Sequence, residues 1–205
     1  MKRILLMSIL ALLALFIGAC DNSNPKSEAP VNKIVEANLT DREEAILTNT
    51  AEKSFVFDFN VVGRPYKELS VWVEKYEYGK LVDERVGGLR SGIEEKGTII
   101  FTTSRPMENG QSIFNMSISS SGSTGTVTNF EAVPDVNEMA STWGSNTIEE
   151  NAIGSEMVLS SICYSNADDG NMHSLSPDFY NDVDSNINEI KDYAIVYLLR
   201  AEFIE

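Results

Sequence analysis

Few side chains in this sequence could act as nucleophiles, general bases or ligands for soft metals. The 205 residues include two cysteines, Cys20 and Cys163, and one histidine, His173. A nucleophilic cysteine or serine needs a base beside it, and a structural zinc site needs several thiol or imidazole ligands together. Cys163 lies in an apolar run, which predicts a buried thiol. His173 lies among loop-forming residues, so we expect an exposed loop residue rather than a member of a catalytic triad.

Oxygen ligands are abundant in the acidic, amide-rich stretch 166–189. The candidates for a calcium site are Asp168, Asp169, Asp182 and Asp184. Calcium accepts about six to eight oxygen ligands in a flexible geometry. The stretch nevertheless departs from the EF-hand pattern, because Ile187 replaces the turn glycine and Tyr193 stands in the place of the bidentate glutamate. A solvated acidic loop is therefore the favoured interpretation, and no cofactor is predicted.

Aromatic residues are the remaining candidates for recognition. Trp72, Tyr76 and Tyr78 are separated by four and two residue positions, and these even spacings put them on one face of a predicted strand. One interpretation is a cross-strand cluster that supports the sheet, and the other is a patch that binds a partner. Both stay open at this point.

The elements that position these side chains are mainly strands. Apolar and polar residues alternate in most of the segments between turns, and eight strands are expected at 55–61, 69–78, 81–86, 97–103, 111–119, 126–133, 157–164 and 193–203. Many short strands with turn signals between them predict a mainly β fold, an antiparallel β-sandwich or barrel-like arrangement. The last strand is apolar on both faces, which predicts a central position in its sheet.

One short N-terminal helix is expected before the first of these strands. Thr40 and Glu43 have the spacing of a capping box, which predicts a helix from 41 to about 48 with Ala45 and Ile46 turned to the body of the domain. Gly79 follows Tyr78 between two strand patterns, and a glycine there suits a tight hairpin turn.

The N-terminus carries an export signal. Lys2 and Arg3 precede an apolar segment, 4–17, which is shorter than the roughly 20 residues that a membrane span requires. The four residues Ile17-Gly18-Ala19-Cys20 resemble the lipobox of bacterial lipoproteins. The resemblance implies cleavage before Cys20, a diacylglycerol thioether and a palmitate-type acyl chain on that residue, and an anchor in the membrane.

The resemblance also implies a location and a domain organisation. Asp21 directly after the lipidated cysteine implies the outer face of the cytoplasmic membrane. We expect a cleaved signal peptide at 1–19, a flexible tether at 20–38 and a single domain at 39–205. In this arrangement the chain is similar to the small uncharacterised lipoproteins of spore-forming bacteria.

The charge of the chain limits the classes of partner that it can bind. The formal net charge is −15, and removal of 1–19 would take away two bases and no acid. Such a surface is repelled by phosphate groups, which excludes nucleic acid as the main partner.

The anchor, the tether, the β pattern and the scarcity of catalytic motifs together favour a non-enzymatic module that binds an envelope protein or a wall component. The alternatives are a carrier of a small ligand or Ca²⁺, and an envelope hydrolase that uses His173 or a pair of carboxylates.

Overall fold

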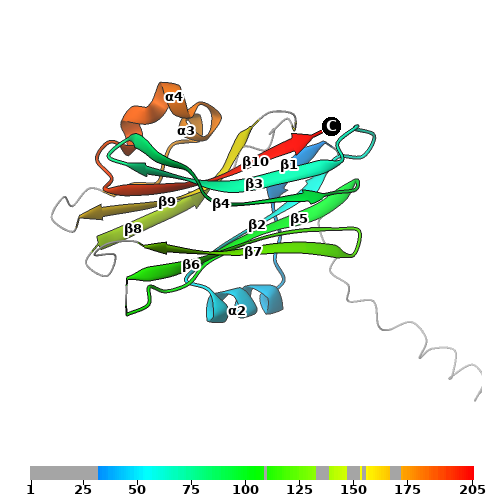
Figure 1. The fold of residues 1–205 in the computed structure, drawn as a ribbon, viewed down its shortest axis with the longest axis horizontal. Coiled ribbons are helices and arrows are strands. Elements are labelled where there is room, and N and C mark those ends of the chain that lie inside the picture. Colours follow the sequence, from blue (N-terminus) through cyan, green and yellow to red (C-terminus); the bar gives the residue numbers. More distant parts are fainter. Residues whose placement is uncertain (1–31, 109, 133–138, 147–152, 154–155, 167–171) are drawn as a thin grey trace, which may run out of the picture.

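The chain folds into two antiparallel five-stranded sheets that face each other (Figure 1). The structure is a computed structural model, and it describes residues 32–108, 110–132, 139–146, 153, 156–166 and 172–205. The first sheet has the order β1-β2-β5-β6-β7, formed by Lys33–Glu36, Lys53–Asn60, Lys96–Thr103, Gln111–Ser120 and Ser123–Ala132. The second has the order β4-β3-β10-β9-β8, formed by Lys80–Gly92, Glu68–Glu77, Ile195–Ile204, Met157–Asn166 and Met139–Ser145. The predicted mainly β, antiparallel fold is confirmed, and it is a sandwich rather than a closed barrel.

The main core lies between the two sheets and follows from the alternation in the sequence. Phe55, Phe57 and Phe59 of β2 all point inward and are at most 3% exposed. Phe114 of β6 meets Tyr197 of β10 edge to face, with ring centroids 5.0 Å apart. Aromatic pairs of this geometry add to the free energy gained from burial. The core thus joins the centres of both sheets.

Strand β10 occupies the centre of the second sheet, between β3 and β9, as its sequence predicts. Tyr197 and Leu199 face the first sheet, and Val196 and Leu198 face the opposite side. All four side chains are at most 1% exposed. The apolar character of both faces therefore reflects a layer packed on each side of the strand.

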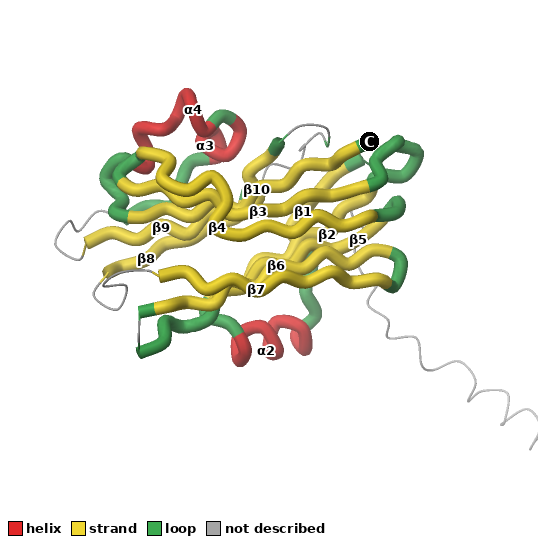
Figure 2. Tube along the Cα trace, in the orientation of Figure 1, coloured by secondary structure: helices red, strands yellow, loops and turns green. Residues whose placement is uncertain are grey.

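The outer layer of the second sheet is a helical cap (Figure 2). It consists of α3 (Pro177–Asn181), α4 (Val183–Asn186) and the 3₁₀ helix η3 (Ile187–Ile190). Phe179, Val183 and Ile190 are buried in a second apolar cluster with Leu198. The expectation of a solvated loop over 166–189 is therefore wrong from Pro177 on, because these spaced apolar residues pack on the sheet. Asp178, Asp182 and Asp184 remain exposed.

Helix α2 (Asp41–Thr50) lies on the outer face of the first sheet (Figure 2). Its predicted capping box is present: Thr40 Oγ1 accepts from the Glu43 N–H at 3.3 Å, and the Thr40 N–H donates to Glu43 Oε2 at 2.9 Å. No residue of the helix is buried. Ile46 is 52% exposed but lines a hollow between the helix and the sheet, so it is turned to the body of the domain as predicted. Ala45 is exposed and does not line this hollow, so the expectation is wrong for Ala45.

Two short strands have no counterpart in the sequence prediction. β1 pairs with β2, so the sheet begins at Lys33, inside the segment expected to be a tether. β8 pairs with β9 and forms one edge of the second sheet. A strand of four residues is too short to show an alternating period, and the Ser, Thr and Gly content of β8 gives a weak apolar signal.

Candidate binding site

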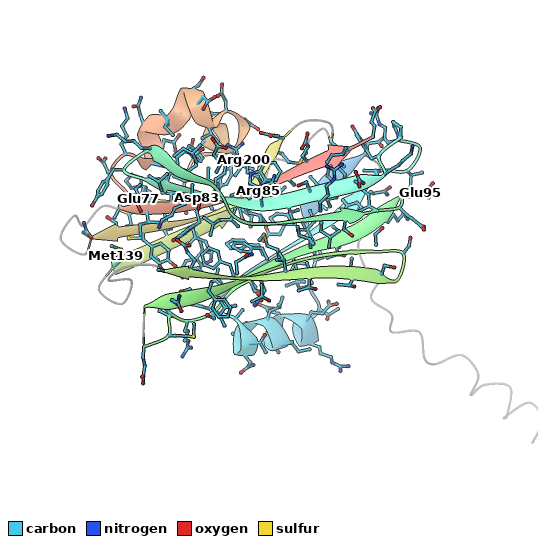
Figure 3. All side chains as sticks on the ribbon, in the orientation of Figure 1. Glu77, Asp83, Arg85, Glu95, Met139 and Arg200 are labelled. Atoms are coloured by element: carbon cyan, nitrogen blue, oxygen red, sulfur yellow. The ribbon has the colours of Figure 1, made fainter. Side chains whose placement is uncertain are left out.

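The three aromatic candidates of β3 and its turn lie in different environments. Trp72 and Tyr76 point to the outer face of the second sheet, but they are only 5% and 6% exposed. Arg85 is labelled in Figure 3. Its guanidinium carbon lies 5.1 Å from the centre of the Trp72 ring. Tyr76 belongs to the cluster under the helical cap. Only Tyr78, which is 57% exposed, presents its ring at the surface.

A buried ion pair lies beside Tyr76. Glu74 Oε2 accepts from Arg200 Nε at 2.9 Å and from the Tyr76 hydroxyl at 3.0 Å. Burial raises the pKa of Tyr76 to about 12, and the charge of Glu74 adds to this effect. The phenol therefore stays protonated at neutral pH. These contacts link β3 to β10, and they account for the polar residues on a largely apolar face.

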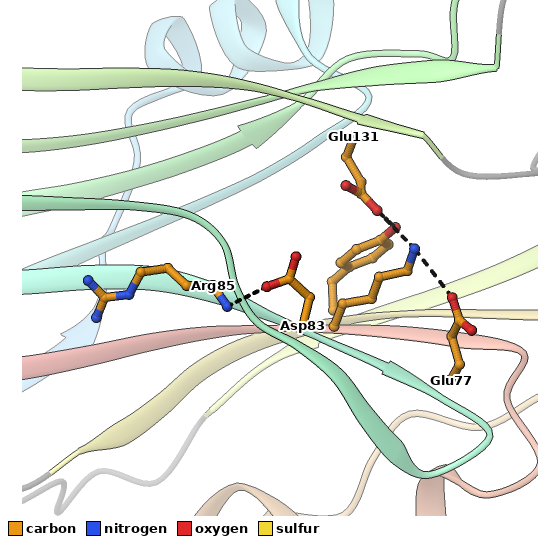
Figure 4. A network of polar contacts seen from close by, with 6 residues as sticks. Glu77, Asp83, Arg85 and Glu131 are labelled. Carbon is orange, nitrogen blue, oxygen red and sulfur yellow. Dashed lines mark hydrogen bonds and ion pairs between the residues drawn. The ribbon is translucent and has the colours of Figure 1, made fainter.

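A second polar network joins the two sheets at one end of the sandwich (Figure 4). Glu131 of β7 accepts a hydrogen bond from Tyr197 of β10 at 2.9 Å and pairs with Lys75 Nζ of β3 at 3.0 Å. Lys75 also lies 3.4 Å from Glu77. Burial, followed by the charge of Glu131, raises the pKa of Tyr197. The network therefore holds a neutral donor and a cation against one carboxylate.

A bulge in β4 shapes the edge next to this network. Val73 faces Gly87 and Lys75 faces Asp83, so three residues of β4 stand opposite Glu74 alone. The Arg85 N–H donates to Asp83 Oδ1 at 2.8 Å across the bulge (Figure 4). Bulges redirect side chains. This one carries the chain past Glu74 and contains Arg85, whose side chain contacts Trp72 as described above.

Tyr78 and His173 line the same polar hollow, of about 460 Å³. Its lining consists of Tyr78, Ser165, His173, Glu189, Lys191, Asp192 and Tyr193. The hairpin turn approaches η3 closely, since a Cβ on Gly79 would lie 2.8 Å from Cγ of Lys191. Gly79 has a φ of 74°, which glycine adopts without strain. The turn glycine thus brings Tyr78 against the helical cap.

Several contacts around the hollow support the local fold. Glu189 accepts from the Ser176 N–H at 2.9 Å and from Ser176 Oγ at 2.6 Å, so its carboxylate fixes the residue that caps α3. The Tyr193 hydroxyl bonds the backbone of His173. His173 is an exposed loop residue, as the sequence predicts. The alternative of a hydrolase that uses His173 is not tested by this exposure.

The calcium candidates that the structure describes lie on the helical cap. Asp182 caps α4, where its Oδ1 accepts from the Ser185 N–H at 3.0 Å, and this hydrogen bond lowers its pKa. Asp184 is exposed in the first turn of the same helix. Asp168, Asp169 and Cys20 lie outside the described residues. Among the residues that are described, no group of three or more His, Cys, Asp or Glu side chains could hold a metal ion.

Cys163 has the environment that its sequence predicts. The side chain is 1% exposed and belongs to the cluster between the second sheet and the helical cap. Burial raises the pKa of its thiol to about 12. Because the thiolate is the reactive form, this residue behaves as an apolar core residue.

The most apolar hollow of those described here lies beneath α2, a place that the sequence did not indicate. It has a volume of about 340 Å³, and its apolar lining comes from the helix, the segment before it and two strands: Ala37, Leu39, Ile46, Leu47, Val56 and Ile100. The chain is attached to the sheet on both sides of the helix. The Ala37 N–H donates to the Val56 carbonyl and the Glu52 N–H to the Thr103 carbonyl, each at 2.8 Å. The helix therefore spans the groove without filling it.

The polar groups of this groove are acidic or neutral. Asp58 lies in the floor, where its Oδ1 accepts from Thr98 Oγ1 at 2.7 Å. Glu43 lines the same hollow, and Glu44 lines an adjoining one. Neither lining includes a lysine or an arginine among the described residues. We call the two hollows together the α2 groove.

A comparison with known protein families matches the chain over residues 33–203 to the family described as the YgaN domain. The chain belongs to the YgaN domain family. The match runs from the first residue of β1 almost to the end of β10, so it includes both sheets and α2. No curated protein and no solved structure matches the chain. No helix within the described part of the chain is long and apolar enough to cross a membrane.

Two hollows of opposite character therefore lie on this YgaN domain. The hollow at Tyr78 is lined by hydroxyl, carboxylate and amine groups and suits a small polar ligand. The α2 groove has an apolar floor and wall and suits an apolar side chain or an alkyl group. Each outer face of the sandwich thus offers one candidate binding site.

Proposed function

We propose that this YgaN domain is a non-enzymatic binding module, anchored through lipid on Cys20 to the outer face of the cytoplasmic membrane, that binds a protein or wall component of the cell envelope. The α2 groove is its contact surface. The lipobox-like residues that end in Cys20 support the anchor, and the net charge of −15 suits a domain that stands clear of anionic headgroups.

The observation that carries the proposal is a helix with no buried residue held over an apolar sheet surface. Leu39 and Ile46 are 37% and 52% exposed, while Val56 below them is 7% exposed. A partner that inserted an apolar group between them would remove this surface from water, which favours binding by about 25 cal/mol per Å². Burial of apolar surface in the groove therefore contributes more free energy to binding than contact with the polar strands around it.

Photo-cross-linking in intact cells tests this contact surface. A photoreactive residue at Ile46 is compared with one at Val82, which has nearly the same exposure, 51%, but lies on β4 of the other sheet. We expect a discrete cross-linked product from position 46 and none, or a different one, from position 82. Identical patterns from both positions would exclude the groove as the specific contact.

The anchor has its own test. Cys20→Ala removes the only thiol that precedes the described residues. We expect the variant to lose incorporation of a palmitate analogue, because alanine has no sulfur atom to form the thioether. Unchanged incorporation would contradict the lipid anchor and leave the groove contact to be judged on its own.

A second candidate function rests on the polar hollow at Tyr78. Its hydroxyl, carboxylate and amine groups could orient a small polar ligand, which corresponds to the alternative of a ligand carrier. A thermal-shift screen of sugars, amino acids and metal ions on the chain tests it. A stabilised ligand complex that Tyr78→Ala abolishes would support this function, and a response unaffected by that variant would exclude the hollow.

A further inference from the structure

The α2 groove combines an apolar interior with negatively charged side chains and has no lysine or arginine in its described lining. Val56 and Ile100 form its floor, and Ile46 and Leu47 of the helix form a wall. Asp58 lies among them, half-buried, on the outward side of β2. Its partner in the structure is the neutral Thr98 hydroxyl, and no ion pair to Asp58 occurs within the described residues. The floor therefore keeps an uncompensated negative charge beside apolar surface.

The helix increases this negative field. The first turn of α2 contains three acids, Asp41, Glu43 and Glu44, and one base, Arg42, and its last turn contains no basic residue. Glu43 and Glu44 line the groove itself. Because the Glu43 carboxylate is engaged in the capping box, we base the inference on Asp58 and Glu44. An occupant that is both apolar and cationic would be complementary to this surface, whereas an anionic lipid or an acidic peptide would be repelled.

We propose that the occupant of the α2 groove is a basic amphipathic peptide segment of a partner protein, whose apolar residues enter the groove and whose lysines or arginines meet Asp58 and Glu44. The inference rests on the proposed binding function and names the chemistry of the partner.

A peptide segment satisfies both halves of the surface at once. In a helical segment, residues at i and i+3 or i+4 share one face, so apolar side chains can enter the groove together. Lysine and arginine place their apolar stems against apolar surface and their charged ends near carboxylates. Asp58 at the floor then selects a cation at a defined distance from the apolar residues.

Binding of a model peptide to the full chain tests the inference. The chain carries Cys20→Ser, which removes the lipid attachment point. The probe is a helical leucine–lysine peptide about as long as α2, and its partner probe has glutamine in place of every lysine. We expect the lysine peptide to bind at least about tenfold more tightly at low salt, with the difference shrinking as the ionic strength rises towards 0.5 M, since salt screens exposed charges.

Two aspartates provide a matched pair of variants. Asp58→Asn and Asp83→Asn each remove one charge from a strand residue whose Oδ1 accepts one hydrogen bond, at 2.7 and 2.8 Å, and asparagine can still accept it. Asp83 lies on β4 of the other sheet. We expect Asp58→Asn to weaken the lysine peptide about three- to tenfold and Asp83→Asn to leave it unchanged. Equal effects of both variants would mean attraction by net charge alone and would overturn the inference.

The apolar half of the surface needs a separate variant. Ile46→Ser removes an exposed wall residue, so the fold does not depend on it. We expect about tenfold weaker binding of the lysine peptide, with no change in melting temperature. Failure of the peptide test together with a specific cross-link at position 46 would reject the basic peptide and keep the binding function. Failure of both experiments would reject both proposals.

Discussion

At the scale of single residues, burial determines how much each ion pair affects the free energy of unfolding. The side chains of Glu74 and Arg200 are 11% and 15% exposed. The Glu74 carboxylate oxygen that accepts from Arg200 also accepts from the Tyr76 hydroxyl. Glu68 and Arg90 form a pair between β3 and β4 in which the side chains are 42% and 56% exposed. The two pairs thus provide the same chemistry at two degrees of solvation.

Glu74→Gln is predicted to destabilise the fold far more than Glu68→Gln. The first change leaves a mostly buried guanidinium beside a neutral amide, which costs about 1–3 kcal/mol. The second removes a solvated pair, which is worth about 0–1 kcal/mol. Urea unfolding of the two variants measures the difference. A loss of similar size in both would show that burial is not the deciding factor.

The residue scale also shows what the sequence could not foresee. Cys163 and His173 occupy the environments expected of them, because an apolar run and a loop-forming neighbourhood are local signals. Trp72 and Tyr76 were expected on one face of a strand, and they lie there, but the sequence does not show that Arg85 and the helical cap cover them. These covering segments are distant in the sequence, and nothing next to Trp72 or Tyr76 identifies them.

At the scale of elements, the period-two alternation predicted the strands and the capping box predicted α2. The elements that were missed have weak local signals. β1 has four residues, and the helices of the cap have four or five each, although Ser176 followed by Pro177 is a recognisable helix start. The α2 groove could not be predicted, since it depends on how far the helix stands from the sheet.

Glycine at position 97 is predicted to be essential for the pairing of β5 with its neighbours. A Cβ there would lie 2.3 Å from the Ser119 carbonyl oxygen and from the Phe59 ring, whereas a Cβ on Gly125 of β7 meets nothing closer than 3.5 Å. Gly97→Ala should therefore cost about 3 kcal/mol or more by displacing backbone and core. Gly125→Ala should change stability by less than about 1 kcal/mol. Thermal unfolding compares them, and similar melting temperatures would contradict the tight packing at Gly97.

At the scale of the whole molecule, buried phenols and a buried thiol make the fold sensitive to alkali. Burial raises the pKa of Tyr76 and of Tyr180 from 10.0 to about 12, and that of Cys163 from 9.0 to about 12. Above pH 9 to 10 the unfolded chain releases these protons while the folded chain keeps them. The folded state then binds more protons, so the free energy of unfolding falls as the pH rises.

We therefore predict full stability from these groups below about pH 9 and a progressive loss as the pH rises to about 12. The melting temperature at pH 8, 10 and 11 under constant ionic strength measures this loss. Tyrosine absorbance recorded in parallel should show the buried phenols ionising together with unfolding. A melting temperature that stays constant from pH 8 to pH 11 is incompatible with buried, neutral phenols.

The two sheets are joined into one body by the apolar core and by the network of Glu131, Lys75 and Tyr197. Helix α2 differs from this body because none of its residues is buried. Segments with few buried contacts open most readily, and binding of a partner protects them. We therefore expect the partner to bind at α2, the least buried of the described helices.

Amide hydrogen exchange measures whether a partner covers α2. The exchange of residues 45–50 is compared between the chain purified alone and the chain in membranes with its envelope partners, with the exposed β4 segment 80–86 as the internal reference. We predict that exchange in α2 slows at least about tenfold in the membranes while exchange in the β4 segment is unchanged. Equal exchange of α2 in both preparations would contradict a binding function that acts through the α2 groove.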